Sequence, residues 1–319
     1  MGLAYSILPP QGPVIISGCD TGFGNLLALR LARAGWTVYA TCLTTTGSDS
    51  LTKEGLPNLT VFSVDITKDD SVRKFGEDVE KLSPNGIYAL INNAGISGGH
   101  VIEWTSMDEY RRIMDVNFFG HVSMTKAFLP SLRKYAKSHS GPQDARPRVV
   151  FVSSIAGLVT SYCISAYSAS KHAIESFASS LRLEMDPFDV IVSVVGPTFA
   201  RTPLAMNAFV GLEKRIEGLD EELKEVYGVD AMKRLQKAYE TNTLTGIASV
   251  EVDEVVKTLE ETVVRKVPWE RYAVGLVAKY WFPLFRVLPW SFGKYISGGH
   301  AYSAVVKKYA AKAKALKTQ

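Results

Sequence analysis

The strongest constraint on the fold is a glycine-rich turn near the start of the chain. Residues 14–17 form a short, mostly apolar run, and residues 18–24 read Gly-Cys-Asp-Thr-Gly-Phe-Gly. Residues 25–34 have helical periodicity and stop at Gly35, and residues 36–41 supply the next strand. This order of strand, turn, helix and strand predicts a βαβ unit, whose glycines let a pyrophosphate approach the helix N-terminus.

The alternation of strand and helix continues along the chain. Asp65 ends the third strand, and the sixth is followed by Gly196 and Pro197, which we expect to break it. The further strands and helices are predicted at 59–64, 69–82, 88–91, 108–136, 149–152, 190–195 and 252–264. We therefore predict one α/β domain over residues 12–265, with a doubly wound, parallel, Rossmann-like sheet that binds its ligand at the carboxyl ends of the strands.

The chemistry is suggested by Tyr167 and Lys171. Four residues apart on a helix, they share one face. A free tyrosine has a pKa of about 10, and a neighbouring ammonium favours the phenolate and lowers that pKa. The pair is therefore a candidate general acid and base. Ser154, at the end of a strand-like run, could hold a substrate oxygen beside the phenol.

Composition excludes several other classes. The chain has 319 residues, 46% of them hydrophobic and 21% charged, as in folded proteins, and its net charge of +4 does not indicate nucleic acid binding. Three cysteines and five scattered histidines give neither a disulfide framework nor metal-ligand spacing. No secretory signal or transmembrane run is recognisable, and the myristoylation pattern at residues 1–6 is read as a frayed tail. We expect an intracellular protein.

Four motifs in order resemble those of the short-chain dehydrogenase/reductase family: the glycine turn, Asn-Asn-Ala-Gly at 92–95, Ser154, and Tyr-x-x-x-Lys at 167–171. The resemblance implies that Tyr167 transfers a proton, that Lys171 lowers its pKa and holds the nicotinamide ribose, and that Ser154 orients the substrate oxygen. It also implies that Asn117 keeps a water in a proton relay. Asn117 interrupts an apolar run inside the predicted helix 108–136, so it needs hydrogen-bond partners.

The same resemblance assigns the residues that bind the cofactor, with Asp65 at the adenine and Thr202 at the carboxamide. Two departures from the family pattern are Ser17 for threonine and Thr198 for a glycine, and the second puts the local backbone near the nicotinamide in question. No metal ligand is expected. The cofactor-binding residues are Gly18, Asp20, Gly22, Phe23, Gly24, Asp65, Ile66, Asn92, Ala94, Gly95, Tyr167, Lys171, Pro197, Thr198 and Thr202.

The second strand ends without a recognisable ribose ligand. Residues 41–44 contain no acidic residue for the ribose 2′-hydroxyl, and neither they nor Thr21 offer a cation for a 2′-phosphate. Without such a cation, NAD is favoured as cofactor and NADP remains possible.

A narrower resemblance leads to the branch that holds retinol, 17β-hydroxysteroid and 3-hydroxybutyrate dehydrogenases. It is carried by residues 18–27, 42–44 and 93–97, and by Arg271-Tyr272 before an aromatic tail. It implies NAD and membrane association, in the endoplasmic reticulum or mitochondria.

Residues 266–319 form a C-terminal extension, and its part 268–296 is rich in aromatic and basic residues. Two interpretations stay open: a clasp packed on the domain or on a dimer partner, and a peripheral patch on a membrane. Basic residues after Lys307 would add attraction to anionic lipid. We also expect a homo-oligomer.

Three functions follow. The first is hydride transfer between a nicotinamide cofactor and a lipophilic alcohol or ketone, of retinoid or steroid kind. The second is a 3-hydroxybutyrate-type dehydrogenase, with Arg201 as the anchor for the carboxylate. The third, a cofactor-binding sensor or scaffold without turnover, is disfavoured because a pure binder has no use for a tuned phenol.

Overall fold

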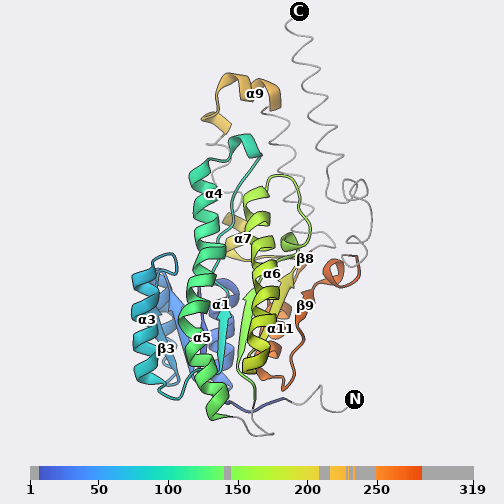
Figure 1. Ribbon diagram of the computed structural model, residues 1–319. Helices are drawn as coiled ribbons and strands as arrows, with labels where there is room; N and C mark the ends of the chain where they lie inside the picture. Colours follow the sequence, from blue (N-terminus) through green and yellow to red (C-terminus); the bar gives the residue numbers. More distant parts are fainter. Residues whose placement is uncertain are drawn as a thin grey trace, which may run out of the picture.

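The computed structural model describes residues 7–139, 145–207, 216–227, 229, 233 and 249–281. Its centre is a seven-stranded sheet in which every neighbouring pair of strands runs parallel (Figure 1). In spatial order the strands are β3 (Leu59–Ser63), β2 (Val38–Cys42), β1 (Val14–Ile16), β4 (Ala89–Asn92), β5 (Arg148–Val152), β6 (Ile191–Pro197) and β9 (Arg271–Val274). The order reverses between β1 and β4, and ligands of such sheets bind at that switch point. The predicted doubly wound parallel sheet is confirmed.

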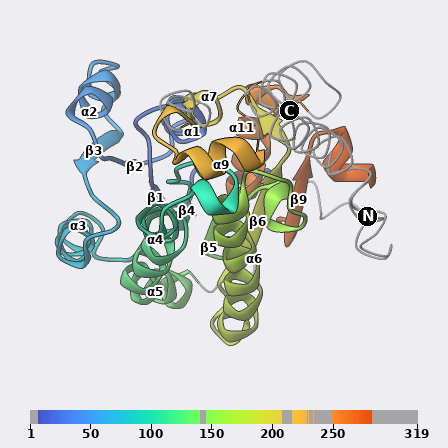
Figure 2. The same ribbon diagram turned by 90° about the horizontal axis from the view of Figure 1, so that it is seen from above.

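Helices cover both faces of the sheet (Figure 2). On one face lie α1 (Gly22–Arg33) and α11 (Val252–Val264), and on the other lie α3 (Asp69–Leu82), α5 (Gly120–Ser138) and α6 (Ser165–Met185). The remaining elements are α2 (Thr45–Thr52), η2 (Ile102–Trp104), α4 (Met107–Met114), η3 (Asp115–Phe119), η4 (Ile155–Gly157), η5 (Asp186–Phe188), β7 (Phe199–Ala200), α7 (Pro203–Asn207), α9 (Glu221–Tyr227), β8 (Ser249–Val250) and η6 (Val277–Trp281).

The alternation of side chains along each strand divides the core in two. On β1, Val14 and Ile16 belong to the apolar cluster under α1 and α11, while Ile15 belongs to the cluster under α3, α5 and α6. All three residues are fully buried. Strands apolar on both faces are what a parallel sheet between two helical layers requires.

Several boundaries follow the predicted ones closely. Helices α3 and α11 have the predicted bounds, and the long helix predicted at 108–136 is present as α4, the π-helical turn η3 and α5 in succession. The sixth predicted strand does not break at Gly196, because β6 runs to Pro197 beside β9. Strand β5 has already ended at Val152, opposite Val195, so the N–H that proline lacks has no partner to lose.

The sheet does not end at residue 265, since β9 lies within the segment 266–319 that we set apart from the domain. The division of the chain at 265 stays a prediction. The aromatic segment 268–296 is described only as far as residue 281. The basic residues after Lys307 and the tail 1–6 lie outside the described residues.

Candidate active site

The glycine turn is built for close backbone contact. Gly18 has a φ of +69°, and a Cβ atom on it would lie 2.5 Å from the Cα atom of Ala94. A Cβ atom on Gly24 would lie 2.5 Å from the carbonyl oxygen of Gly18. Both glycines are therefore required by the packing of the turn against the loop after β4, before any ligand is considered.

Polar side chains fasten that loop to the turn. The hydroxyl of Ser17 accepts hydrogen bonds from the backbone amides of Asn93 and Ala94, at 3.0 and 3.1 Å. The Asn93 amide donates back to the carbonyl oxygens of Ser17 and Gly18, at 2.8 and 3.0 Å. Asn92 is fully buried and donates to Thr125 on α5 at 3.0 Å, so its side chain supports the loop from behind.

Helix α1 begins at the glycine turn with its first amides uncapped. Thr21 precedes the helix in an extended conformation and gives no side-chain cap. Gly22 has a φ of +66°, and a Cβ atom on it would lie 3.8 Å from the Cβ of Thr202, so these two residues face each other. Phe23 packs its ring against the core. An uncapped helix N-terminus behind a glycine turn fits a pyrophosphate.

Asp20 reaches from the turn to the end of β2. Its carboxylate accepts hydrogen bonds from the amide of Leu43 at 3.0 Å, the amide of Thr44 at 2.8 Å and the hydroxyl of Thr44 at 2.6 Å. The sequence after β2 has no acidic residue, but the fold supplies one there from elsewhere in the chain.

Asp65 and Ile66 follow β3 and lie at the same edge of the sheet. Asp65 accepts from the amide and the hydroxyl of Thr67, at 2.9 and 2.7 Å. Ile66 is 7% exposed and packs on α5, where a Cβ on Gly120 would lie 2.7 Å from it.

Asn117 lies in the π-helical turn between α4 and α5, fully buried. Its side chain accepts from the amide of Ile96 at 2.8 Å and donates to the carbonyl of Ile96 at 2.9 Å and to the hydroxyl of Ser170 at 3.0 Å. Ser170 in turn donates to the carbonyl of Tyr167 at 2.7 Å. The partners that Asn117 was expected to need are present. Single π-turns often occur at functional sites.

Tyr167 and Lys171 lie on the first turns of α6, facing the end of β5. The Lys171 ammonium lies 5.7 Å from the centroid of the Tyr167 ring and donates to the carbonyl of Val152 at 2.8 Å. Tyr167 is half-buried, whereas Lys171 is 4% exposed. Ser154 is 9% exposed, two residues after Val152, and its hydroxyl accepts from the amide of Ala156 at 3.1 Å, which caps η4.

Burial is the main cause of the lowered pKa values of Lys171 and of His121. Desolvation lowers the pKa of Lys171 to about 8, against the opposing effect of Glu175. His121, fully buried on α5, has its pKa lowered to about 3 by desolvation and by the charge of Lys171. At neutral pH the histidine is therefore uncharged, and Lys171 is a cation close to the range in which it titrates.

The profile described as short chain dehydrogenase matches residues 13–212 of the chain. The chain belongs to this family. Retinol dehydrogenase 7 of Mus musculus is 35% identical over 279 residues, which cover 86% of this chain and 84% of the relative. 17-beta-hydroxysteroid dehydrogenase type 6 of Homo sapiens is 33% identical over 288 residues, covering 89% of this chain and 86% of the relative.

Solved structures agree on the fold of this short-chain dehydrogenase. A short-chain dehydrogenase from Streptomyces avermitilis matches with a TM-score of 0.68 and 22% identity, over 86% of this chain and 92% of that one. The 3-ketoacyl-(acyl-carrier-protein) reductase of Brucella melitensis, solved with NADH, matches with a TM-score of 0.65 and 19% identity, over 84% and 97%. The chain is an oxidoreductase of this family that uses a nicotinamide cofactor.

The departure at Thr198 is accommodated by a glycine elsewhere. Pro197 ends β6, and the Thr198 amide donates to the carbonyl of Val274 at 3.0 Å. A Cβ on Gly275, whose φ is +97°, would lie 2.3 Å from the Thr198 hydroxyl. The room needed by the threonine side chain is therefore provided by Gly275. Thr202 precedes α7, and its hydroxyl accepts from the amide of Ala205 at 3.4 Å.

Helix α9 lies above the upper end of α4 (Figure 1), and it contributes to an apolar group of residues that we call the α9 cluster. Segment 98–101 joins it to the active site, since a Cβ on Gly99 would lie 3.6 Å from the Cβ of Ala166. The hydroxyl of Tyr227 also donates to Glu103, which ties α9 to η2. The cluster consists of Val101, Trp104 and Ile216, with Cys163, Leu219, Leu223, Tyr227 and Val229 packed against them.

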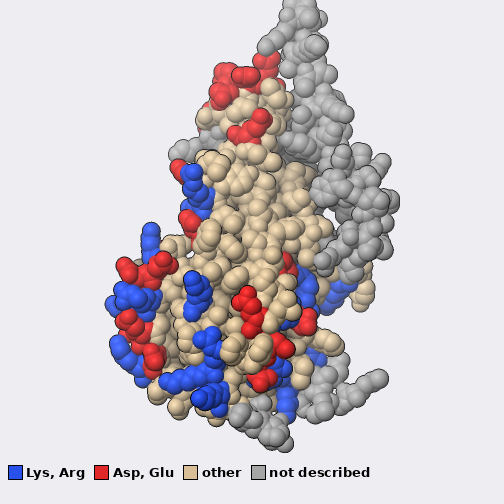
Figure 3. Space-filling view, viewed as in Figure 1, with Lys and Arg blue, Asp and Glu red and all other residues tan. Residues whose placement is uncertain are grey.

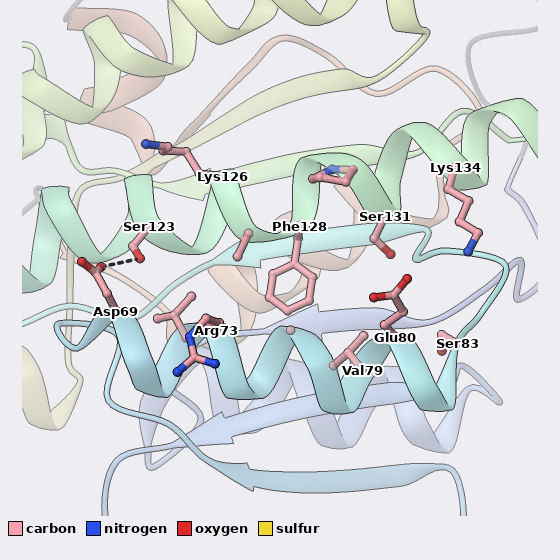
Figure 4. A pocket seen from close by; sticks show the side chains of 14 residues that line it. Asp69, Arg73, Val79, Glu80, Ser83, Ser123, Lys126, Phe128, Ser131 and Lys134 are labelled. Atoms are coloured by element: carbon pink, nitrogen blue, oxygen red, sulfur yellow. Dashed lines mark hydrogen bonds between the residues drawn. The ribbon is translucent and has the colours of Figure 1, made fainter.

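A separate open cleft of about 530 Å³ lies between α3 and α5 (Figure 4). Its lining mixes Arg73, Lys126 and Lys134 with Asp69 and Glu80, and it includes none of the predicted site residues. In the space-filling view both signs of charge gather over α3, whereas the lower part of α5 shows only Lys and Arg (Figure 3). This cleft is distinct from the active site.

Some residues that shape the site are missing from those predicted from the sequence. Asn93, His121 and Ser170 contact the glycine turn, the loop after β4 and Asn117. The sequence does contain a signal that distinguishes Asn92 from Asn93. Successive strand residues point to opposite faces of the sheet, so only one of the two side chains can face the glycine turn. Arg201, the proposed carboxylate anchor, is exposed.

Over the described parts of the chain, no helix combines the length and the apolar character needed to cross a lipid bilayer.

Proposed function

We propose that this short-chain dehydrogenase interconverts a lipophilic alcohol and its ketone or aldehyde, of retinoid or steroid kind, with Tyr167 as proton donor and acceptor. The main support for this role of Tyr167 is that the buried Lys171 ammonium lies 5.7 Å from the centroid of the Tyr167 ring. A cation at that distance, in a poorly solvated site, favours the phenolate and lets Tyr167 exchange a proton near neutral pH.

The bound nicotinamide supplies the hydride donor or acceptor. The chain's own residues bind and orient. The hydroxyl of Ser154, at the end of β5, holds the substrate oxygen, and Lys171 keeps the Tyr167 proton mobile. Asn117, already bonded to Ile96 and Ser170, holds a water that returns protons to Tyr167. The first amides of α1, behind the turn of Gly18, Gly22 and Gly24 and beside Ala94, bind the pyrophosphate, and the lack of a side-chain cap at that helix N-terminus supports this.

The lipophilic substrate class is supported by two independent observations. The relatives named above are a retinol dehydrogenase and a 17-beta-hydroxysteroid dehydrogenase. The α9 cluster gives the region beside the start of α6 an apolar character, which suits a substrate that must leave water. No comparable observation favours a short hydroxy acid, which would need a buried cation, and Arg201 is exposed.

NAD is the proposed cofactor. Asp20 carries a negative charge at the end of β2, where the adenosine ribose of a dinucleotide lies in such folds. A carboxylate can accept from two ribose hydroxyls and repels a 2′-phosphate. This observation strengthens the preference for NAD that the absence of cations near the turn suggests.

The proposed partners are a membrane surface and a second copy of the chain. Trp269, Leu276 and Tyr280 are 59%, 63% and 72% exposed at the start of the C-terminal extension, and such aromatic and apolar side chains suit a membrane surface. We propose peripheral association with an intracellular membrane, and a homo-oligomer. Cosedimentation with anionic vesicles tests the first, and sedimentation equilibrium tests the second.

The function is tested on the purified full-length protein, with NAD or NADP and a panel of retinol, a hydroxysteroid and 3-hydroxybutyrate. We expect turnover of the lipophilic alcohols, and a loss of about 10²–10⁴-fold in kcat for Tyr167→Phe with NADH affinity retained. Tyr39→Phe is the matched control. The Tyr39 hydroxyl shares one hydrogen bond with the hydroxyl of Ser83, at 2.8 Å, and both residues lie away from the active site. Turnover of hydroxybutyrate alone, or NADH binding without any turnover, would contradict the proposal.

A further inference from the structure

A third charged residue stands on the same face of α6 as Tyr167 and Lys171. Glu175 follows Lys171 by one helical turn, as Lys171 follows Tyr167. Its side chain is 16% exposed, and its carboxylate forms an ion pair with Arg271 on β9. Helix α6 therefore presents a phenol, an ammonium and a carboxylate in succession, with a guanidinium beyond them.

Two glycines make room for this ion pair. A Cβ atom on Gly157, in the turn after Ser154, would lie 3.0 Å from Cγ of Glu175 and 2.9 Å from the carbonyl oxygen of Lys171. A Cβ on Gly196 would lie 2.7 Å from the guanidinium of Arg271. The pair thus fits tightly between the turn after Ser154 and β6, the two segments that carry the active-site serine and Pro197.

Arg271 holds one carboxylate oxygen of Glu175 and leaves the other uncommitted. Oxygen Oε1 of Glu175 is buried and has no hydrogen-bond partner among the described residues, while Oε2 pairs with Arg271. An unpartnered buried carboxylate oxygen is unfavourable unless a nearby positive charge compensates it. Lys171, one turn away, supplies that charge, and Glu175 acts on it electrostatically.

The groups that face Lys171 from other elements cannot replace this carboxylate. His121 on α5 is uncharged at neutral pH, and Tyr167, on α6 itself, is the group whose pKa is to be lowered. Arg271 on β9 has the same charge sign as Lys171, and its ion pair with Glu175 compensates that charge. Without Glu175, desolvation alone would act on the lysine, and it acts against the ammonium form.

We propose that Glu175 is a positioning residue whose negative charge keeps Lys171 protonated. Its ion pair with Arg271 prevents the carboxylate from pairing directly with Lys171 and drawing the ammonium away from Tyr167. The inference rests on the proposed role of Tyr167. It adds a two-residue support, reaching from α6 to the last strand of the sheet, to the tyrosine and lysine.

The test compares Glu175→Gln with Glu270→Gln. Glu270 pairs with Arg182 at 3.8 Å and connects the same helix to the residue before β9, but its side chain is 77% exposed. In Glu175→Gln we expect the apparent pKa of Tyr167 to rise by about one unit, so that kcat/KM for alcohol oxidation falls about tenfold at pH 7 and recovers at high pH. Glu270→Gln should keep the wild-type profile.

A second readout needs no turnover. The ultraviolet difference titration between each variant and its Tyr167→Phe counterpart follows the phenolate directly in the cofactor-free protein, and should show the same rise. The double variant Glu175→Gln with Arg271→Gln removes both charges, so it separates the loss of the Glu175 carboxylate from the effect of an Arg271 left without its ion-pair partner: the shifted titration should persist in it. A titration of Tyr167 that does not move in Glu175→Gln, or that returns to wild type in the double variant, would overturn the inference even if turnover is normal.

Discussion

The carboxylate of Asp20 accepts hydrogen bonds from both the backbone amide and the hydroxyl of Thr44, 24 residues further along the chain. This contact joins the glycine turn to the residue that follows β2. In the sequence, the glycine turn contains an acidic residue, whereas no acidic residue directly follows β2. In the fold the two segments lie together, at the place where we propose that the adenosine ribose binds.

Removing that charge should change the choice of cofactor. In Asp20→Asn the remaining oxygen can still accept both bonds from Thr44, but the amide NH2 cannot accept from the Leu43 N–H, and the repulsion of a 2′-phosphate is lost. We expect the ratio of kcat/KM with NAD to that with NADP to fall about tenfold, or about 1.4 kcal/mol. Asp49→Asn, on the exposed side of α2, removes the same charge away from the turn and should leave the ratio unchanged. An unaltered ratio in Asp20→Asn would show that the carboxylate does not face the ribose.

The close contact at Gly18 predicts a second result. Gly18 and Gly55 both have a positive φ, of +69° and +63°, but a Cβ on Gly18 would meet Ala94 at 2.5 Å and a Cβ on Gly55 would meet nothing within 4 Å. Gly55→Ala should therefore lower the free energy of unfolding only by the backbone strain, about 1 kcal/mol. Gly18→Ala should lower it further and also weaken NADH binding, as measured by urea unfolding and fluorescence quenching. Equal losses in the two variants would mean that the turn can move away from Ala94.

Asn117 and Asn58 form another matched pair. Asn58 donates to the carbonyls of Ala32 and Trp36, both at 2.7 Å, and Asn117 bonds Ile96 and Ser170. Changing either to alanine leaves backbone groups unsatisfied, so each should lower the free energy of unfolding by about 1–3 kcal/mol. Asn117→Ala alone should also reduce kcat, by roughly tenfold or more if it orders the proton relay. If the two variants lose stability equally and both keep wild-type kcat, Asn117 has only a structural role.

These contacts also indicate what a sequence can and cannot give. The periodicity of residues 14–34 and the apolar strands predicted the parallel sheet, because local patterns determine elements and a βαβ repeat restricts their order. The bounds of α3 and α11 followed from their amphipathic faces. The strand β9 was not predicted, since four residues in an aromatic segment carry little periodic signal and the strand is defined by its pairing with β6.

The site divides in the same way. Tyr167 and Lys171 are recognisable because both lie on one helix, where spacing gives proximity. The acidic residue at the end of β2 was sought at 41–44 and is supplied by Asp20, and the partner of Glu175 lies 96 residues away. Likewise, the space for Thr198 comes from Gly275. Each of these depends on contacts between segments distant in sequence, which periodicity does not encode.

The last prediction concerns His121, which is fully buried on α5 behind the loop after β4. Its Nε2 lies 2.6 Å from the carbonyl oxygen of Ala94 and donates to it in the neutral form, while burial and Lys171 lower its pKa to about 3. The histidine of the unfolded chain titrates near its ordinary pKa of about 6.5. Between these values the unfolded chain binds the additional proton, so stability is present above pH 6.5 and is lost progressively as the pH falls towards 3.

At pH 5 this difference amounts to about 2 kcal/mol, at 1.36 kcal/mol for each pH unit below the unfolded value. In His121→Gln, whose side-chain amide can still donate to Ala94, the loss of stability between pH 7.5 and pH 5 should be smaller than in wild type by about that amount. The exposed His172, changed to Gln, should leave the pH dependence as it is. Urea unfolding at the two pH values measures both. The prediction rests on a buried imidazole that stays neutral beside Lys171. If His121→Gln has the same acid sensitivity as wild type, His121 of the wild-type protein must take up its proton in the folded state. Lys171 would then lie beside a second cation.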